Sequence, residues 1–308
     1  MILVSGGTGF IGQVVVRQLK MAQQSVRLLL RPSSRSPKLP TGIAVEAAIS
    51  SLQDERSLRA ALKGVDTVIH LAGAERWSSR ADLSGVDVAG TQVLSHCAAE
   101  AGVQKFIFLS HLGADQASAF AVLRAKGLAE IAIQRSGVPA VILRSAVVFG
   151  PGDQFTTSLA RLLKVSPGIF FSPGKGESIL QPIWVEDLGA CILGLLDDET
   201  RSGKTIQVGG GEYFTFKQIV DELCRVLQIK RKLVELPPAY LRGLALWMEN
   251  SFPNFPVSIY WLDYLSADRS CPIDSLTRQF GILPARFGQQ LDYLVDEIKK
   301  PVLNRKTA

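Results

Sequence analysis

Cysteine and histidine are scarce in this sequence, and their spacing excludes several classes of protein. The 308 residues include four cysteines and three histidines. The cysteines are scattered without a Cys-x-x-Cys pair, which excludes a disulfide framework. No histidine lies at ligand spacing from a cysteine, so we expect no metal site. Uninterrupted apolar runs of about 18 residues are also missing, so we expect no membrane-spanning helix.

Acidic residues are absent from the first 45 positions, which carry six of the 34 basic residues. The other 28 basic residues balance the 28 acidic ones, so the net charge of +6 comes from this segment. Three interpretations are open: a cleaved transit peptide, a nucleic-acid-binding patch or a local anion site. An apolar content of 47% excludes a disordered chain and is ordinary for a globular protein of this length.

The first 30 residues have the pattern of a strand, a glycine-rich turn, a helix and a second strand. Residues 1–4 and 26–30 are apolar runs, residues 5–12 contain the glycines, and apolar residues at helical spacing lie between them. A transit peptide would not encode such a unit, so we expect none. The unit is the context in which a glycine-rich turn binds a dinucleotide.

Gly6, Gly9 and Gly12 are the three glycines that such a turn needs. Gly6 permits the tight turn, Gly9 lets a pyrophosphate approach the backbone, and Gly12 lets the helix pack closely on the strand. Backbone N–H groups at the start of the helix then face the phosphates, and the helix dipole favours that charge. The sequence therefore predicts a dinucleotide cofactor.

Arg31 ends the second apolar run, where an NAD-selective site would have a carboxylate for the ribose 2′-hydroxyl. No acidic residue follows before Glu46. A guanidinium can instead make charge-assisted hydrogen bonds to a 2′-phosphate, with Arg35 as a second contact. We therefore predict NADP(H) in preference to NAD(H). Only the basic excess would support nucleic-acid binding. No aromatic or helix-turn-helix arrangement accompanies it, so we expect no nucleic-acid partner.

Further motifs resemble the short-chain dehydrogenase/reductase superfamily, and they follow in the order of that family. They lie at residues 6–12, 70–73, 88–91, 106–110, around Lys126, and at 143–153 and 182–187. The chain resembles the extended and atypical group, which includes nucleotide-sugar epimerases. Within it, the chain is most similar to the subgroup around the NAD(P)H-binding accessory subunit of respiratory complex I.

This resemblance implies a Rossmann-type, doubly wound parallel sheet in residues 1–150. It also implies a smaller α/β substrate-binding part in residues 151–308, intertwined with the first. Besides the three glycines and the two arginines, the cofactor contacts that it implies are Thr8, Phe10, Ile11, Ser51, Leu52, Leu71, Ala72, Gly73, Ser110, Lys126, Ala146 and Val148. Where the family has Asp-Leu after the third strand, this chain has Ser-Leu, which implies looser adenine recognition.

The catalytic set of the family is a Ser or Thr after the fifth strand and a Tyr-x-x-x-Lys on the next helix. Ser110 matches the first position and Lys126 matches the lysine, but Val122 stands where the tyrosine is expected. The first tyrosine of the chain comes after Glu212, so the usual acid/base is missing from this part. Lys126 can still bind ribose. His111 could donate the proton, or it could be a solvent-facing loop residue.

Two functions are consistent with these residues. The first is an NADP(H)-dependent oxidoreductase acting on an apolar carbonyl, alkene or quinone-like small molecule, because hydride transfer depends mainly on cofactor and geometry. The alternative is a non-catalytic NADP(H)-binding scaffold, redox sensor or accessory subunit, which would tolerate Val122. The missing tyrosine disfavours a nucleotide-sugar epimerase.

Residues 237–265 are rich in aromatic side chains, with three of the five tyrosines and two of the four tryptophans. Charged and polar residues interrupt the segment, so we expect it not to span a bilayer. It could be a lid packed on the core, a pocket for an apolar ligand, or a contact with a membrane or a partner subunit. We expect a cytoplasmic protein, with a peripheral membrane location as the alternative.

Overall fold

A computed structural model describes residues 1–33, 44–74, 81–251 and 259–299. The chain divides into two compact units, and neither is one continuous segment. Unit 1 consists of residues 1–74, 82–145 and 185–208, and unit 2 of residues 75–81, 146–184 and 209–308. The chain therefore returns to unit 1 after it has built the first part of unit 2.

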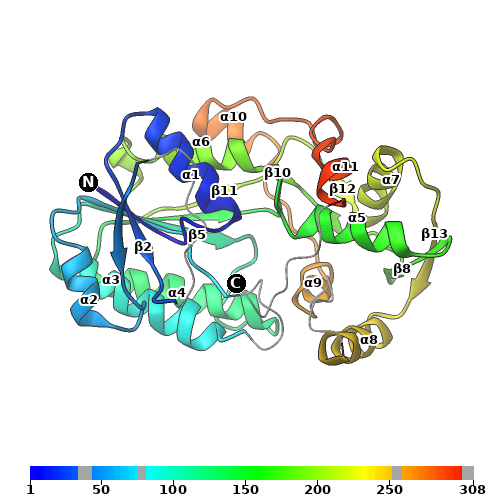
Figure 1. The fold of residues 1–308 in the computed structure, drawn as a ribbon, viewed down its shortest axis with the longest axis horizontal. Helices are drawn as coiled ribbons and strands as arrows, with labels where there is room; N and C mark the ends of the chain where they lie inside the picture. The colour runs from blue at the N-terminus through cyan, green and yellow to red at the C-terminus, as the bar shows by residue number, and fades with distance from the viewer. Residues whose placement is uncertain (34–43, 75–80, 252–258, 300–308) are drawn as a thin grey trace. The chain divides into compact units, whose positions relative to one another are not determined.

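Unit 1 contains a seven-stranded sheet in the order β11-β6-β5-β4-β1-β2-β3 (Figure 1), and every neighbouring pair is parallel. The strands are β1 (Ile2–Ser5), β2 (Val26–Leu30), β3 (Glu46–Ile49), β4 (Thr67–His70), β5 (Lys105–His111), β6 (Ala140–Ser145) and β11 (Thr205–Val208). The strand order reverses between β1 and β4, where a doubly wound sheet binds its ligand. The predicted fold class is confirmed.

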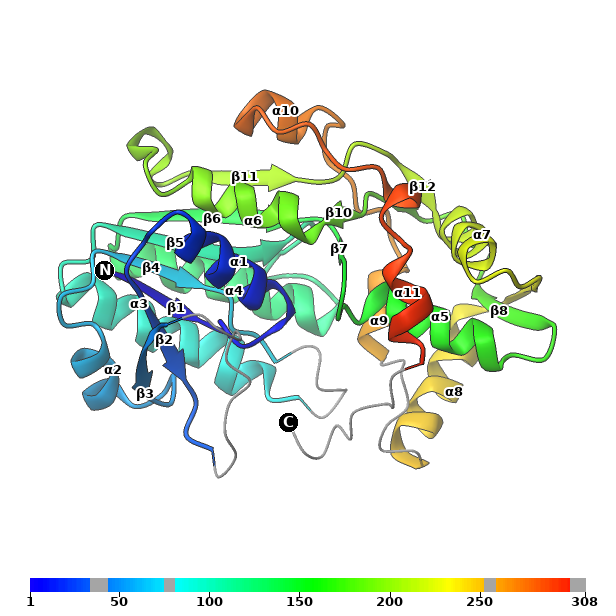
Figure 2. The ribbon, with the colours of Figure 1, turned by 45° about the horizontal axis from the view of Figure 1, so that its top comes forward.

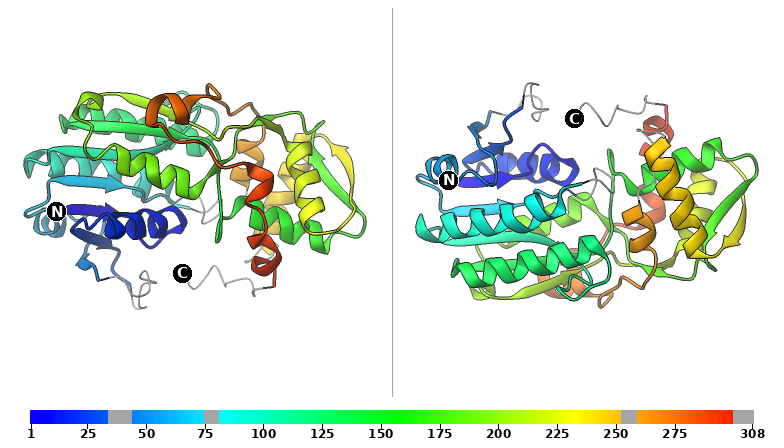
Figure 3. Two further views of the ribbon diagram at one scale, coloured as in Figure 1. Left: turned by 90° about the horizontal axis from the view of Figure 1, so that it is seen from above. Right: turned by 90° about the horizontal axis from the view of Figure 1, so that it is seen from below.

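Helices cover both faces of this sheet, as the two views of Figure 3 show. They are α1 (Phe10–Met21), α2 (Glu55–Ala61), the π-helix η2 (Leu83–Gly90), α3 (Thr91–Glu100), α4 (Ala121–Ser136), α6 (Val185–Gly194) and the 3-10 turn η3 (Glu199–Arg201). Helices α1 and α6 pack side by side (Figure 2), and Gln18 donates to the Glu186 carboxylate at 2.8 Å. Because both faces are covered, the inner strands β1, β4, β5 and β6 are buried along almost their whole length, whereas the edge strands β3 and β11 are partly exposed.

Unit 2 combines short helices with three two-stranded sheets. β7 (Val148–Phe149) pairs with β10 (Ile183–Trp184), β9 (Ile179–Leu180) with β12 (Phe214–Thr215), and β8 (Ile169–Pro173) with β13 (Lys232–Leu236). The helices are α5 (Phe155–Val165), α7 (Phe216–Val226), α8 (Pro238–Ser251), α9 (Ile259–Tyr264), α10 (Ser275–Phe280), the 3-10 turn η4 (Phe287–Gln289) and α11 (Tyr293–Glu297). Buried Phe149, Phe216 and Phe287 lie in its core. Among the described helices, none is long and apolar enough to cross a bilayer.

Candidate functional site

The glycine-rich turn after β1 is as tight as its sequence predicts. Gly6 has φ +74°, a left-handed conformation that glycine adopts without strain. A Cβ at Gly6 would stand 2.7 Å from the Ala72 backbone nitrogen, and a Cβ at Gly12 would stand 2.1 Å from the Gly6 carbonyl oxygen. The first contact brings the turn against the segment after β4, and the second packs α1 onto the turn. Any larger side chain at either position would force the backbone apart.

Helix α1 begins directly after this turn. Gly9 is its N-cap in an extended conformation, and no side chain accepts a hydrogen bond from the first-turn amides at this cap. No acidic residue lies in the first turn. The N–H groups of Phe10, Ile11 and Gly12 are therefore available to an anion at the carboxyl edge of the sheet. This cradle of glycines and backbone donors fits the pyrophosphate of a dinucleotide.

The other predicted cofactor contacts of unit 1 follow the neighbouring strands. Arg31 comes directly after β2 and is exposed, Ser51 and Leu52 follow β3, and Leu71, Ala72 and Gly73 follow β4. Because the strands are parallel, these segments share one edge of the sheet with the glycine-rich turn. Arg35 lies outside the described residues. Ala146 is buried and Val148 half-buried, and both belong to unit 2.

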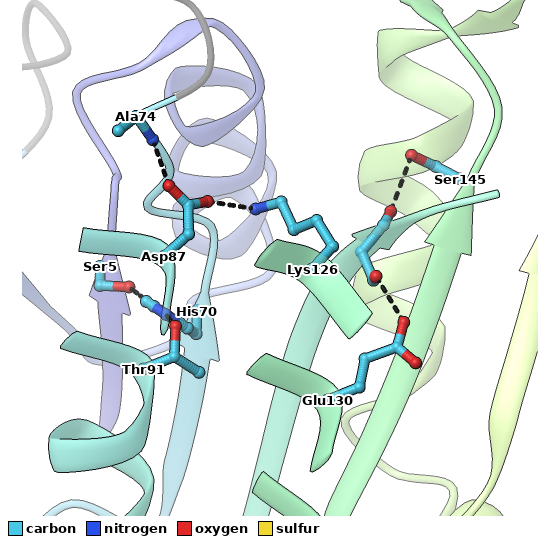
Figure 4. Close-up of polar contacts among 9 residues, drawn as sticks. Ser5, His70, Ala74, Asp87, Thr91, Lys126, Glu130 and Ser145 are labelled. Carbon is cyan, nitrogen blue, oxygen red and sulfur yellow. Dashed lines mark hydrogen bonds and ion pairs between the residues drawn. The ribbon is translucent and has the colours of Figure 1, made fainter. Parts of the chain in front are cut away.

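His70, the last residue of β4, is fully buried and hydrogen-bonded on both sides of its ring (Figure 4). Its Nδ1 lies 2.5 Å from Ser5 Oγ and its Nε2 lies 2.8 Å from Thr91 Oγ1, and the ring stacks on Phe108. Burial, with a smaller contribution from the charge of Lys126, lowers the pKa of His70 to about 3. His70 is therefore a neutral residue that ties β1, β4 and α3 together.

Lys126 on α4 forms a buried ion pair with Asp87 on η2 (Figure 4). The Lys126 Nζ lies 3.0 Å from Asp87 Oδ1, and the side chains are 5% and 1% exposed. Asp87 Oδ2 accepts a hydrogen bond of 2.9 Å from the backbone N–H of Ala74, just after β4. The Asp87 carboxylate thus holds Lys126, the lysine that matches the family position. It also fixes the backbone at Ala74, in the segment after β4.

Ser110 near the end of β5 is fully buried and donates a 2.5 Å hydrogen bond to Glu130 on α4. Arg144 on β6 donates to both oxygens of Glu130, at 2.9 and 2.6 Å. The hydrogen bond to Glu130 raises the pKa of Arg144, so this side chain stays charged. The Ser110 hydroxyl proton therefore lies in a Ser–Glu–Arg cluster that joins two strands to α4.

Val122 lies in the first turn of α4 and is half-buried. All five tyrosines belong to unit 2, so unit 1 has no phenol of its own to replace the missing one. His111 is the last residue of β5 and is also half-buried. His111 therefore lies at the carboxyl end of β5, where the sequence predicts a candidate for proton transfer in unit 1.

Asp87 and Glu130 are the two site residues that sequence reasoning missed. Asp87 directly precedes the 88–91 motif. Glu130 follows Lys126 by four residues, which places Lys126 and Glu130 on the same side of α4. The negative charges of Asp87 and Glu130 could have suggested ion pairs with the positively charged Lys126 and Arg144. Spacing within the chain does not reveal which partners meet, because both pairs join different elements.

Comparison with known proteins gives one family model and several relatives. A model described as NAD(P)H-binding matches residues 6–158. The chain is 29% identical over 276 residues to subunit 9 of the NADH dehydrogenase (ubiquinone) 1 alpha subcomplex of Arabidopsis thaliana, covering 86% of the chain and 68% of the relative. It is 30% identical over 259 residues to a ceramide reductase of Caulobacter vibrioides, covering 80% and 76%. Sterol demethylase protein B of Methylococcus capsulatus is 28% identical, with 79% and 80% covered.

Solved structures share the fold at lower identity. The UDP-glucose 4-epimerase of Thermotoga maritima has a TM-score of 0.72 and 21% identity, covering 97% of this chain and 98% of that one. The triphenylmethane reductase of Citrobacter sp., in complex with NADP(H), has a TM-score of 0.76 and 19% identity, with 96% and 99% covered. At these identities the likeness establishes the architecture alone.

Proposed function

The chain belongs to the NAD(P)H-binding family within the extended and atypical short-chain dehydrogenase/reductases, and from this we propose that it uses NADP(H). The cofactor would lie at the carboxyl edge of the unit 1 sheet, with its pyrophosphate at the start of α1. Gly6 and Gly12 support this placement, because a Cβ at either position would collide with neighbouring backbone. Lys126 and the segment after β4 are the proposed contacts of the nicotinamide ribose.

The proposed preference for NADP(H) depends on Arg31. This guanidinium is exposed directly after β2, beside the strand that carries the glycine-rich turn. A 2′-phosphate would accept charge-assisted hydrogen bonds from it, whereas NAD(H) offers only a hydroxyl there. No acidic residue in the first 45 positions competes for the arginine or repels the phosphate.

We propose an oxidoreductase that reduces an apolar carbonyl or quinone-like small molecule. NADPH supplies the hydride. Unit 1 orients the nicotinamide, and the substrate oxygen takes its proton from His111 or from water. The names of two relatives support an apolar substrate, since one concerns ceramide and the other a sterol.

The experiment that tests cofactor choice compares two arginine variants. NADPH and NADH affinities are measured by fluorescence titration for the wild type, Arg31→Ala and Arg135→Ala. Arg135 is an exposed arginine in the last turn of α4, which lies toward the opposite edge of the sheet. We expect Arg31→Ala to weaken NADPH binding about tenfold or more and to leave NADH binding nearly unchanged. Arg135→Ala should change neither affinity, and an unchanged ratio in Arg31→Ala would contradict the assignment.

A second candidate function is a non-catalytic accessory subunit or scaffold that binds the same cofactor. Val122 favours it, because it cannot donate a proton. The contacts of Lys126 with Asp87 and of Ser110 with Glu130 also favour it, because they join elements of unit 1 without any substrate. The name of the Arabidopsis relative, a subunit of a larger complex, supports a contact with a partner subunit, for which residues 237–265 are the predicted segment. Consumption of NADPH against a panel of ketones, aldehydes and quinones separates the two functions. Tight binding of NADPH without turnover of any of these compounds would support the accessory role.

A further inference from the structure

Helix α8 in unit 2 has an exposed apolar face. Tyr240, Leu244 and Trp247 are 72%, 44% and 60% exposed, and their spacing of four and three residues places them on one side of the helix. Gly243 lies beside them, and a Cβ there would meet no described atom within 4 Å. We call Tyr240, Leu244 and Trp247 the docking face.

The side of α8 next to the docking face packs on the core of its unit. Ala245 is buried, Leu241 and Met248 are half-buried, and the helix packs against α9. Arg242 pairs with Asp263 of α9, so its charge is balanced within the unit. Helix α8 also carries Arg242 and Glu249, so its apolar side chains do not surround it. Large apolar side chains gathered on an exposed helix face mark a contact with protein or with lipid. The docking face therefore indicates that something covers α8 when the protein works.

Strand β13 leads directly into α8 and pairs in a ribbon with β8, which carries two further exposed apolar side chains (Figure 1 shows the three elements). Ile169 and Phe171 alternate on β8 and are each 47% exposed, so they point away from the core on the same side. Their neighbour Phe170 packs into the core of unit 2. Lys232 of β13 is in register with Ile169 and is exposed with it.

Basic residues gather at the start of this ribbon. Residues 223–234 contain four basic residues and no acidic one. Arg231 Nε donates a 2.7 Å hydrogen bond to the Leu163 carbonyl oxygen, which brings the end of α5 and its Lys164 to the same place. We call Lys164, Lys230, Arg231 and Lys232 the basic cluster. Among the residues that the structure describes, no carboxylate forms a salt bridge with these four side chains.

We infer that unit 2 docks on the surface of an anionic lipid bilayer through the docking face and the basic cluster. Tyrosine and tryptophan rings are amphipathic and settle at the headgroup level, with leucine between them reaching the acyl boundary. Lys230 and Lys232 of the basic cluster lie at the start of β13, on the ribbon that leads into α8, and would be attracted by anionic headgroups. A second copy of the chain fits less well, because a two-fold contact would bring the two basic clusters toward each other. The inference is independent of the proposed cofactor chemistry.

Vesicle flotation of the full chain tests this inference. We expect the protein to bind vesicles of phosphatidylcholine with 30% phosphatidylglycerol and to bind pure phosphatidylcholine at least about fivefold more weakly. Leu244→Ser with Trp247→Ser should reduce binding to the anionic vesicles about tenfold or more, because two apolar side chains no longer enter the interface. Lys230→Gln with Lys232→Gln should abolish most of the preference for anionic vesicles.

The control for this experiment is Met21→Ser, since Met21 is 77% exposed but lies on unit 1. It should leave vesicle binding unchanged. Circular dichroism and thermal unfolding are measured for every variant, so that a misfolded protein is recognised without reference to cofactor binding. Absence of wild-type binding to both vesicles, or equal binding by the docking-face variant, would overturn the inference. A wild-type dimer that the docking-face variant makes monomeric would also overturn it and assign the face to a second copy.

Discussion

Two carboxylates hold the side chains at which a catalytic role was predicted, Lys126 and Ser110. Asp87 places the Lys126 ammonium beside the segment after β4, and Glu130 accepts a hydrogen bond from the Ser110 hydroxyl within a cluster completed by Arg144. Each contact joins two elements that meet at the carboxyl edge of the sheet. The same side chains can therefore position this edge for a cofactor even if they move no proton.

Replacing Asp87 by Asn tests whether its ion pair supports the fold. Lys126 would keep its burial and lose its countercharge, so we expect the free energy of unfolding to fall by about 3 kcal/mol. Urea denaturation of Asp87→Asn measures this loss. Asp66→Asn is the matched control, because Asp66 is exposed and pairs only with the N-terminal ammonium, and it should change stability much less. Similar losses in both variants would contradict the assigned role of Asp87.

Installing a tyrosine at position 122 tests whether the substrate pocket keeps its catalytic geometry. The phenol would stand one helical turn before Lys126 in the first turn of α4, where a general acid could reach the substrate oxygen. We expect Val122→Tyr to raise NADPH-dependent turnover of a carbonyl substrate by about tenfold or more. Steady-state kinetics measure the gain, with Val122→Phe as the control for ring size. Equal rates in the two variants would argue that position 122 does not face the reacting atoms.

At the scale of elements, the contact between α5 and α11 contains a titratable group that is unusually buried. Asp153 precedes α5 and accepts hydrogen bonds from the backbone and hydroxyl groups of Thr156 and Thr157. Thr156 Oγ1 in turn lies 2.7 Å from the Tyr293 hydroxyl of α11. Burial outweighs these hydrogen bonds and raises the pKa of Asp153 to about 6. The folded protein therefore retains this proton more tightly than the unfolded chain does.

The raised pKa of Asp153 predicts a direction for the pH dependence of stability. Its contribution is fully present below about pH 4 and is lost as pH rises through about 6, since the unfolded carboxyl then releases its proton first. We expect this group to reduce the free energy of unfolding by about 3 kcal/mol between pH 4 and pH 7. Denaturation of the wild type and Asp153→Asn across this range measures it. Parallel curves for the two proteins would refute the prediction, because only the wild type carries the titrating group.

For the whole molecule, the architecture of unit 1 could be predicted from the sequence, and so could the segments proposed to contact the cofactor at the carboxyl edge of its sheet. The glycine spacing, the apolar runs and the position of Arg31 each depend on neighbours close in the chain, and local rules of conformation apply to them directly. The partners of Lys126 and Ser110 depend instead on which helix crosses which strand, so spacing could not reveal them. The side of α8 left exposed is equally a result of packing, because apolar residues occupy two neighbouring sides of the helix and the sequence does not tell which of them meets α9.

The return of residues 185–208 to unit 1 has a consequence for how the protein could have changed over time. These residues supply α6, which binds α1, and β11, which completes the sheet beside β6. A fragment ending near residue 150 would leave the β6 edge unpaired and the outer side of α1 uncovered. Recombination could not exchange the whole of unit 2 as one terminal block without removing part of the cofactor-binding sheet. New specificities would arise more readily through loop insertions and point substitutions within unit 2.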